Sequence, residues 1–168
     1  FPRSGNSFLR KFLEQCTGIA TGSTMHLHTS TSLQVAGLKG EYIVDDRAWI
    51  VKTHHPVQMQ LNLGFQTGKV VCCVRHPLDS FVSLANFINT MSHSASAEWD
   101  YPRDYPQWWD WMVRWAADSW AHYYEVLLKH CTKEGKAHIY FTRYEDLVNN
   151  ARPELEGIMR YILDLESL

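Results

Sequence analysis

The chain lacks the features that mark several large classes of protein. Its net charge is -2 over 168 residues, so no overall charge draws it to nucleic acid or to an anionic membrane. No run approaches the roughly 20 apolar residues of a membrane-spanning helix, and no signal peptide is visible. No internal repeat, low-complexity tract or linker divides the sequence. Any anion site must therefore be local and built from a few placed residues.

The spacings of cysteine and histidine that are typical of metal and redox sites are also missing. The four cysteines include no CxxC pair, and the adjacent Cys72 and Cys73 lie in an apolar run typical of a buried strand. Successive strand residues face opposite sides, so these two are poorly placed to bond each other. We expect reduced cysteines, with one long-range disulfide left open. The histidine pairs His26–His28 and His54–His55 have no cysteine or carboxylate cluster nearby, so no metal is expected.

What is present indicates one globular domain, covering residues 1–168. Apolar residues make up 45% of the chain, and the many aromatic side chains suit either a large core or a ring-binding pocket. The chain begins at Phe1 without a methionine, already inside the first polar motif. We therefore expect a domain that is truncated at both ends.

Hydrophobic periodicity predicts helices that alternate with strands. The expected helices cover 7–16, 77–89, 107–131 and 154–163, and the expected strands cover 49–51, 69–74 and 138–142. Residues 91–106 are expected to form a loop. This order predicts an α/β fold with a parallel sheet flanked by helices on both faces. Ligands of such folds bind at the carboxyl ends of the strands, where the polar motifs fall.

The long aromatic helix predicted at 107–131 contains Trp108, Trp111 and Trp115 at helical spacing. Stacking on a sugar ring and packing in the core would both use such residues. The spacing favours core packing.

The first polar motif, PRSGNSF at 2–8, leads directly into the first predicted helix. Gly5 allows close backbone approach, and a helix N-terminus offers free N–H groups and a partial positive charge. Arg3 adds a cation that can fork two phosphate or sulfate oxygens, and Ser4 and Ser7 can donate hydroxyl hydrogen bonds. The pattern GxxxxGK[ST] is absent, so this is not a Walker A loop. A plain turn with Ser or Asn as helix cap is the alternative.

The second motif is Lys52-Thr53-His54-His55-Pro56 at a strand end. Lys52 could stabilise developing negative charge, and His54 could accept a proton at neutral pH. His55 is interpreted as a bystander. A solvated basic loop is the alternative.

The third motif, RHPLDSFVS, follows the buried strand and contains Arg75 and Ser83 two helical turns apart. Both could reach one phosphate. A cation at the end of a buried strand needs a partner, which is either a ligand or Asp79. In the fourth motif, YEDL, Tyr144 could pack on a base. The acids at 145–146 could cap a helix or pair with an arginine.

The order of these motifs resembles that of the sulfotransferases that use 3′-phosphoadenosine 5′-phosphosulfate (PAPS). The matching segments are 2–5 (PRSG), 52–54 (KTH), 75–83 (RHPLDSFVS) and 144–147 (YEDL), which span nearly the whole chain. The resemblance implies a P-loop-like sulfotransferase fold and transfer of a sulfuryl group from PAPS to an acceptor hydroxyl, without a metal. A C-terminal basic, glycine-rich loop of that family is not seen before Leu168.

The resemblance also implies roles for individual residues. The 5′-phosphosulfate would be bound by the first loop, namely Arg3, Ser4, Gly5, Asn6 and Ser7. Arg3 stands where the family usually has lysine, and Phe8 where it often has an adenine-stacking tryptophan. Arg75 and Ser83 match the pair that binds the 3′-phosphate, and Tyr144 matches a residue near the adenine. His54 matches the catalytic base, with Lys52 beside it and Arg3 sharing the charge of the transferring group.

Three loop segments, PRSGNSFLR at 2–10, TGS at 21–23 and KGE at 39–41, look most like the branch that carries WSC domains. That branch implies a carbohydrate acceptor such as sialic acid, contacted here from the polar loop 92–104. It also implies a Golgi membrane anchor with a lumenal catalytic domain; without the branch, a cytoplasmic location is expected. The oligomeric state is not indicated.

Two other functions remain open at this point. A nucleotide kinase could share the architecture, although the first loop lacks the Walker lysine. A non-catalytic nucleotide- or glycan-binding module descended from the enzyme is the second, against which the Lys52–His54 pair argues. The basic residues are few and scattered, which speaks against nucleic-acid binding.

Overall fold

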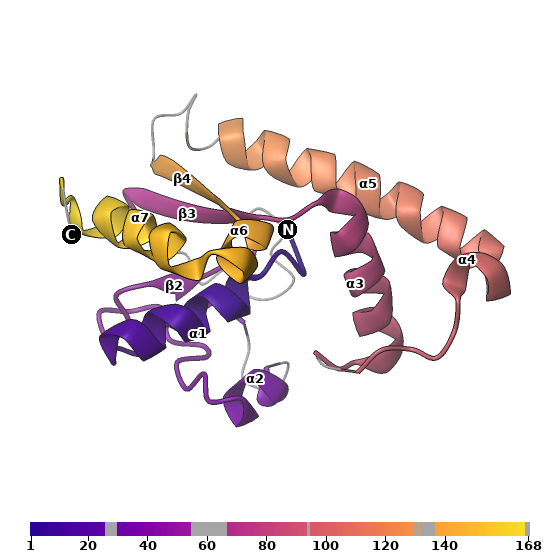
Figure 1. The fold of residues 1–168 in the computed structure, drawn as a ribbon, viewed down its shortest axis with the longest axis horizontal. Helices are drawn as coiled ribbons and strands as arrows, with labels where there is room; N and C mark the ends of the chain where they lie inside the picture. The colour runs from indigo at the N-terminus through magenta and orange to yellow at the C-terminus, as the bar shows by residue number, and fades with distance from the viewer. Residues whose placement is uncertain (26–29, 55–66, 94, 130, 132–136, 167–168) are drawn as a thin grey trace.

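A computed structural model of the chain describes residues 1–25, 30–54, 67–93, 95–129, 131 and 137–166 (Figure 1). The elements in these ranges are, in chain order, α1 (Asn6–Thr17), β1 (Gly22–Ser23), α2 (Thr31–Val35), β2 (Val51–Lys52), β3 (Lys69–Val74), α3 (Pro77–Thr90), α4 (Tyr101–Asp104), α5 (Pro106–Leu128), β4 (His138–Arg143), α6 (Tyr144–Asn149) and α7 (Ala151–Leu163). Helices and strands alternate, which confirms the α/β class.

The strands of the described residues pair in parallel, as predicted, but they form two short sheets rather than one. β1 pairs with β2, with Gly22 opposite Val51. β3 pairs with β4 over six residues, from Lys69 opposite His138 to Val74 opposite Arg143. Because both pairs are parallel, the residues that follow β3 and β4 leave at the same edge. Arg75 and Tyr144 are therefore brought close together.

The strongest periodic signals gave the correct elements. The strand predicted at 69–74 coincides with β3, and the helices predicted at 7–16 and 77–89 lie within α1 and α3. The expected loop at 91–106 is wrong in part, since it contains α4. Asp100 caps that helix by accepting a hydrogen bond from the Arg103 N–H, and Pro102 suits its first turn.

Two apolar clusters form the core, and the β3–β4 pair contributes to both. Cys72 belongs to a cluster with Phe81 of α3 and Met112 of α5. Cys73 belongs to the other, with Leu9 of α1 and Ile158 of α7. Adjacent strand residues thus enter different clusters, as strand geometry predicts. All four cysteines are free thiols.

The prediction that the tryptophan stripe packs in the core is wrong for two of its members. Trp111 and Trp115 are 60% and 46% exposed, and their rings stack on each other with centroids 6.2 Å apart. Trp108 is partly buried against the core. The α5 helix packs against α3, and its buried stripe is instead Met112, Ala116, Tyr123, Tyr124 and Leu127.

Two features are missing from the described residues. None of the helices in the described ranges has both the length and the apolar character that crossing a membrane requires. No group of three or more His, Cys, Asp or Glu side chains in those ranges is arranged to hold a metal ion. His26, His28 and His55, which the sequence offered as metal ligands, lie outside the described residues.

Candidate functional site

The N-terminus of α1 is left open by its own sequence. Gly5 occupies the N-cap position at φ 100°, and no side chain caps the helix. The first turn also contains no acidic residue. The alternative of a Ser or Asn cap is therefore wrong. The first N–H groups of α1 have no side-chain acceptor at the cap, an arrangement suited to an anion.

Gly5 is required for a second reason, which is close packing. A Cβ atom at this position would lie 2.5 Å from Cδ2 of Tyr144. The positive φ angle is itself a conformation that side chains disfavour. The loop is further fixed at Ser4, which is 1% exposed and whose carbonyl oxygen accepts a hydrogen bond from Sγ of Cys73 at 2.8 Å. The first loop is thus held against the ends of β3 and β4.

Arg3, in the first loop, contacts residues on and after α3. Its Nε atom donates to Oγ of Ser83 at 3.0 Å, and its Nη1 atom donates to Nδ1 of His93 at 2.8 Å. The guanidinium also lies 5.3 Å from the centroid of the Phe87 ring. Burial, and then the charge of Arg75, lowers the pKa of Arg3 from its usual value. These three partners of the cation are all neutral.

Arg75 lies directly behind Arg3. Its Nη1 atom donates to the carbonyl oxygen of Arg3 at 3.2 Å, and its guanidinium stacks 4.5 Å from the centroid of the Tyr144 ring. The alternative pairing with Asp79 is not seen, and Asp79 is exposed. Neither arginine forms an ion pair with a carboxylate of the described residues. The two cations therefore lie close together without an ion pair to a carboxylate of the described residues, although the charge of Arg75 contributes to the lowered pKa of Glu145.

Aromatic side chains border the cations on one side. Tyr144, the first residue of α6, packs edge-on against Phe8 with centroids 5.8 Å apart. Phe8 is 38% exposed on the first turns of α1. The acids after Tyr144 do not pair with Arg3 or Arg75. Glu145 accepts a hydrogen bond from the N–H of His76 at 2.9 Å and lies 3.8 Å from Arg143.

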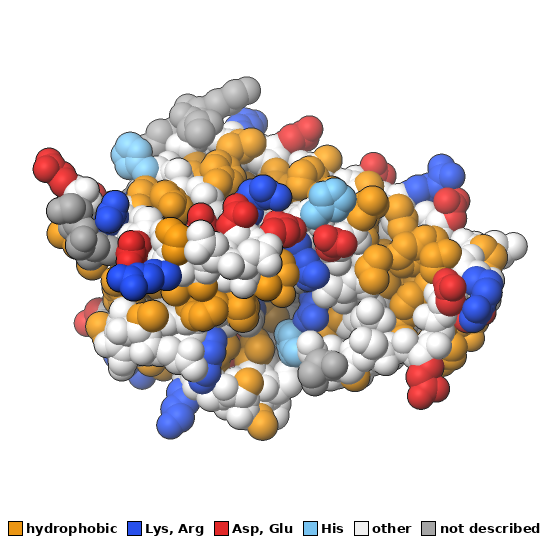
Figure 2. Space-filling model, viewed as in Figure 1, with side chains coloured by type: hydrophobic (Ala, Val, Ile, Leu, Met, Phe, Trp, Pro, Cys, Tyr) orange, Lys and Arg blue, Asp and Glu red, His pale blue; other side chains and the backbone are white. Residues whose placement is uncertain are grey.

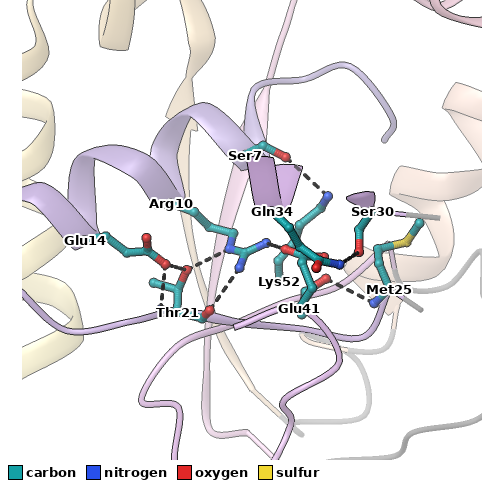
Figure 3. A network of polar contacts seen from close by, with 10 residues as sticks. Ser7, Arg10, Glu14, Thr21, Met25, Ser30, Gln34, Glu41 and Lys52 are labelled. Atoms are coloured by element: carbon teal, nitrogen blue, oxygen red, sulfur yellow. Dashed lines mark hydrogen bonds and ion pairs between the residues drawn. The ribbon is translucent and has the colours of Figure 1, made fainter. Parts of the chain in front are cut away.

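Lys52 enters from β2 and contacts the first loop. Its Nζ atom donates to Oγ of Ser7 at 3.3 Å (Figure 3). Burial lowers the pKa of Lys52 to about 8, and the charge of Glu41 partly opposes that shift. Lys52 thus remains mostly protonated at pH 7, as a third cation near the N-terminus of α1.

The buried network beside Lys52 was not predicted from the sequence. Arg10 and Glu41 form an ion pair whose side chains are 3% and 0% exposed, and Arg10 also donates to Oγ1 and the carbonyl oxygen of Thr21 (Figure 3). Glu14 accepts from both the N–H and the hydroxyl of Thr21. The available signal was Arg10 itself, a charged residue between Leu9 and Leu13 on the apolar side of α1.

His54 follows β2 and lies close to Lys52. Burial, and then the charge of Lys52, lowers the pKa of His54 to about 3, so the ring is neutral at pH 7. Its Nδ1 atom is enclosed and has no hydrogen-bond partner in the described part of the chain. A neutral imidazole with an unoccupied nitrogen can accept a proton.

Segments from the whole chain therefore converge. The first loop supplies Arg3, the end of β3 supplies Arg75, α3 supplies Ser83, and β2 supplies Lys52. Basic side chains gather between the region of α1 and that of α3 (Figure 2). The arrangement can bind an anion that carries more than one negative charge, with aromatic rings alongside.

Known proteins were compared with the chain. The model of the sulfotransferase domain matches residues 1–163. A WSCD family member of Aedes aegypti is 29% identical over 163 residues, which cover 96% of this chain and 48% of that protein. A WSCD family member of Drosophila melanogaster is 27% identical, with the same coverage. The chain thus spans about half the length of these relatives. No solved structure gives a significant match.

The family match extends over nearly the whole chain and includes every motif that meets at the site. The chain therefore belongs to the sulfotransferase domain family.

Proposed function

We propose that the chain transfers a sulfuryl group from PAPS to a hydroxyl group, on a carbohydrate acceptor. The observation that supports this most is the meeting of Arg3, Arg75 and Ser83 without a carboxylate partner among the described residues. The two guanidinium groups are half-buried and close to each other, so an anionic ligand would relieve their repulsion. A nucleotide with phosphates at two positions would supply it.

The donor's groups can be assigned to separate parts of the site. Arg75 and Ser83 would bind the 3′-phosphate, since both lie on the α3 side. The open N-terminus of α1, with Asn6, Ser7 and Lys52, would bind the 5′-phosphosulfate. Phe8 and Tyr144 offer ring faces to the adenine. Arg3 contacts Ser83 and would therefore bind both the 3′-phosphate and the 5′-phosphosulfate of the donor.

The reaction would be an in-line displacement at sulfur. A bond forms between the acceptor oxygen and sulfur while the bond from sulfur to the 5′-phosphate oxygen breaks, which releases 3′-phosphoadenosine 5′-phosphate. His54 would accept the hydroxyl proton. Its pKa is too low for an efficient base in the free chain, and the charge of a bound anion would raise it. Lys52 and Arg3 would stabilise the charge on the transferring group and the leaving phosphate.

The acceptor and the location are proposed from the resemblance of the loop segments to the branch that carries WSC domains. A carbohydrate hydroxyl, approached from the segment 92–104, and a lumenal position in the Golgi both belong to this proposal. A single P-loop-like sheet with helices on both faces is also proposed for this domain. It would join the two strand pairs seen here.

Turnover tests the proposal. The chain is incubated with PAPS and a panel of sugars that includes sialic acid, and sulfated product is detected by mass spectrometry. His54→Ala should abolish turnover while the affinity for 3′-phosphoadenosine 5′-phosphate changes little. His122→Ala, an exposed histidine on α5, is the matched control.

The outcomes separate the possible functions. Loss of turnover and of affinity to the same extent in His54→Ala would remove the base assignment. Nucleotide binding without turnover on any acceptor would favour a binding module instead.

A further inference from the structure

His93 lies on the segment after α3, outside all four sequence motifs. Its Nδ1 atom is the acceptor for Nη1 of Arg3 at 2.8 Å, although the two residues are 90 positions apart. Its ring packs against that of Phe87, with centroids 5.1 Å apart. The contact is therefore a tertiary one that brings this segment against the first loop.

The contact requires a neutral imidazole. A guanidinium carries only donors, so Nδ1 must accept and the ring proton must sit on Nε2. The charged groups that face the ring are Arg3 from the first loop and Lys52 from β2. Partial desolvation of this largely exposed ring, followed by the charges of Arg3 and Lys52, lowers the pKa of His93. No carboxylate of the described residues pairs with His93 to oppose them.

His93 is one of three residues that contact the Arg3 guanidinium. Ser83 holds Nε, His93 holds Nη1 and the Phe87 ring covers one face. A planar group that is bound through two different nitrogens cannot rotate freely. Among the described residues, Nη2 of Arg3 has no hydrogen-bond partner. A lysine could not be held in this way, because its ammonium is a single point with three rotatable donors.

We propose that His93 is a positioning residue of the donor site: through Nδ1, its neutral ring fixes the Arg3 guanidinium so that the remaining N–H groups face the donor's phosphosulfate. This rests on the proposed function of Arg3. Protonation of His93 would turn a donor and a positive charge toward Arg3. Acidification then releases the guanidinium and weakens donor binding.

The test measures the affinity for 3′-phosphoadenosine 5′-phosphate by calorimetry at a series of pH values, from neutral to the lowest pH at which the chain stays folded, because the pKa of His93 lies below its ordinary value. His93→Ala removes the acceptor and should weaken binding about tenfold at neutral pH, which equals about 1.4 kcal/mol. His93→Asn places an amide oxygen where Nδ1 stood, and it should bind much as the unchanged chain does. His122→Ala is the control for loss of an exposed histidine.

The pH dependence separates positioning from a merely structural role. The amide introduced by His93→Asn does not titrate, so this variant should lose less affinity than the unchanged chain on acidification. Protonation of the nucleotide's own phosphates affects both proteins equally and cancels in the ratio. Thermal unfolding of each variant checks that the fold is intact, which we expect because His93 is exposed.

Two results would overturn the assignment of His93 alone. One is tight binding by His93→Ala at neutral pH, and the other is an equally steep acid loss in His93→Asn, each while the unchanged chain binds the nucleotide. If the unchanged chain does not bind it at all, the proposed donor site falls and the role of His93 falls with it.

Discussion

Arg10 and Arg3 lie close together in the chain, yet their surroundings are opposite in kind. Arg10 is buried on α1 and is neutralised by Glu41, with Thr21 accepting two further hydrogen bonds. Arg3 reaches only neutral groups, the Ser83 hydroxyl and the His93 ring, and it lies near a second cation, Arg75.

The difference separates a structural arginine from a ligand-binding one. Where the protein supplies the counter-charge, the cation belongs to the fold, and removing it leaves an uncompensated carboxylate. Where the protein supplies none, repulsion between cations is tolerated because a ligand can relieve it. Arg10 should therefore matter for stability, and Arg3 and Arg75 for binding.

The largest expected effect is on folding, at the buried pair. Arg10→Met leaves Glu41 charged and unpaired, which should lower the free energy of unfolding by about 3–5 kcal/mol in urea denaturation. Replacing both partners, as Arg10→Met with Glu41→Leu, should restore most of that loss. Arg114→Met, which breaks an exposed pair with Asp110, should cost less than about 1 kcal/mol. An unchanged stability in Arg10→Met would erase the contrast with Arg3.

The next effect is on binding, at the unpaired cation. Arg75→Met should weaken the affinity for 3′-phosphoadenosine 5′-phosphate by a factor of about one hundred or more, because two hydrogen bonds to a charged group are lost. The unfolding free energy should change little. Calorimetry and urea denaturation on the same preparation measure both. A variant whose unfolding free energy falls while its affinity for the nucleotide is unchanged would place Arg75 in the same class as Arg10.

The smallest expected effect is a change in the pH dependence of activity, caused by Lys52. Its pKa of about 8 means that its proton is lost as the pH rises through that value, so kcat/KM for the donor should fall on the alkaline side. The arginine of Lys52→Arg stays protonated in this range, so kcat/KM of this variant should not fall on the alkaline side. An alkaline limb that persists in Lys52→Arg would assign it to another group.

Deprotonation of Lys52 does not itself destabilise the fold as the pH rises. The folded pKa of Lys52 lies below its unfolded value of about 10.4, so the unfolded chain binds more protons between these two values. The contribution of Lys52 to stability therefore increases as the pH rises through this window. Burial raises the pKa values of the Cys72 and Cys73 thiols to about 11 and about 12, so these groups lower stability in the upper part of the window, and urea denaturation at each pH separates unfolding from loss of activity.

How much the sequence predicts depends on how local the signal is. β3 was predicted over its full range, because a short apolar run ending in a charged residue is a strong strand signal. The sequence also predicted that the polar motifs lie at the carboxyl ends of the strands, and the pairing of β3 with β4, known only from the structure, brings Arg75 and Tyr144 together there. These motif residues could be named in advance.

Contacts between distant segments could not be predicted in the same way. Glu41 lies 31 positions from Arg10 in a stretch without a periodic pattern, so nothing in the sequence pairs them. His93 follows α3 in a segment interpreted only as a polar loop. Trp111 has the spacing of a core residue, but the face that α5 buries is decided by its packing against α3.

The central claim is that Arg3 and Arg75 bind a nucleotide that is phosphorylated at two positions, and one measurement tests it most directly. Calorimetry would compare 3′-phosphoadenosine 5′-phosphate with adenosine 5′-phosphate, which differs only by the 3′-phosphate. The account predicts that the first binds at least about tenfold more tightly, a difference of about 1.4 kcal/mol, and that Arg75→Met removes this preference. Equal affinity for the two nucleotides would contradict it.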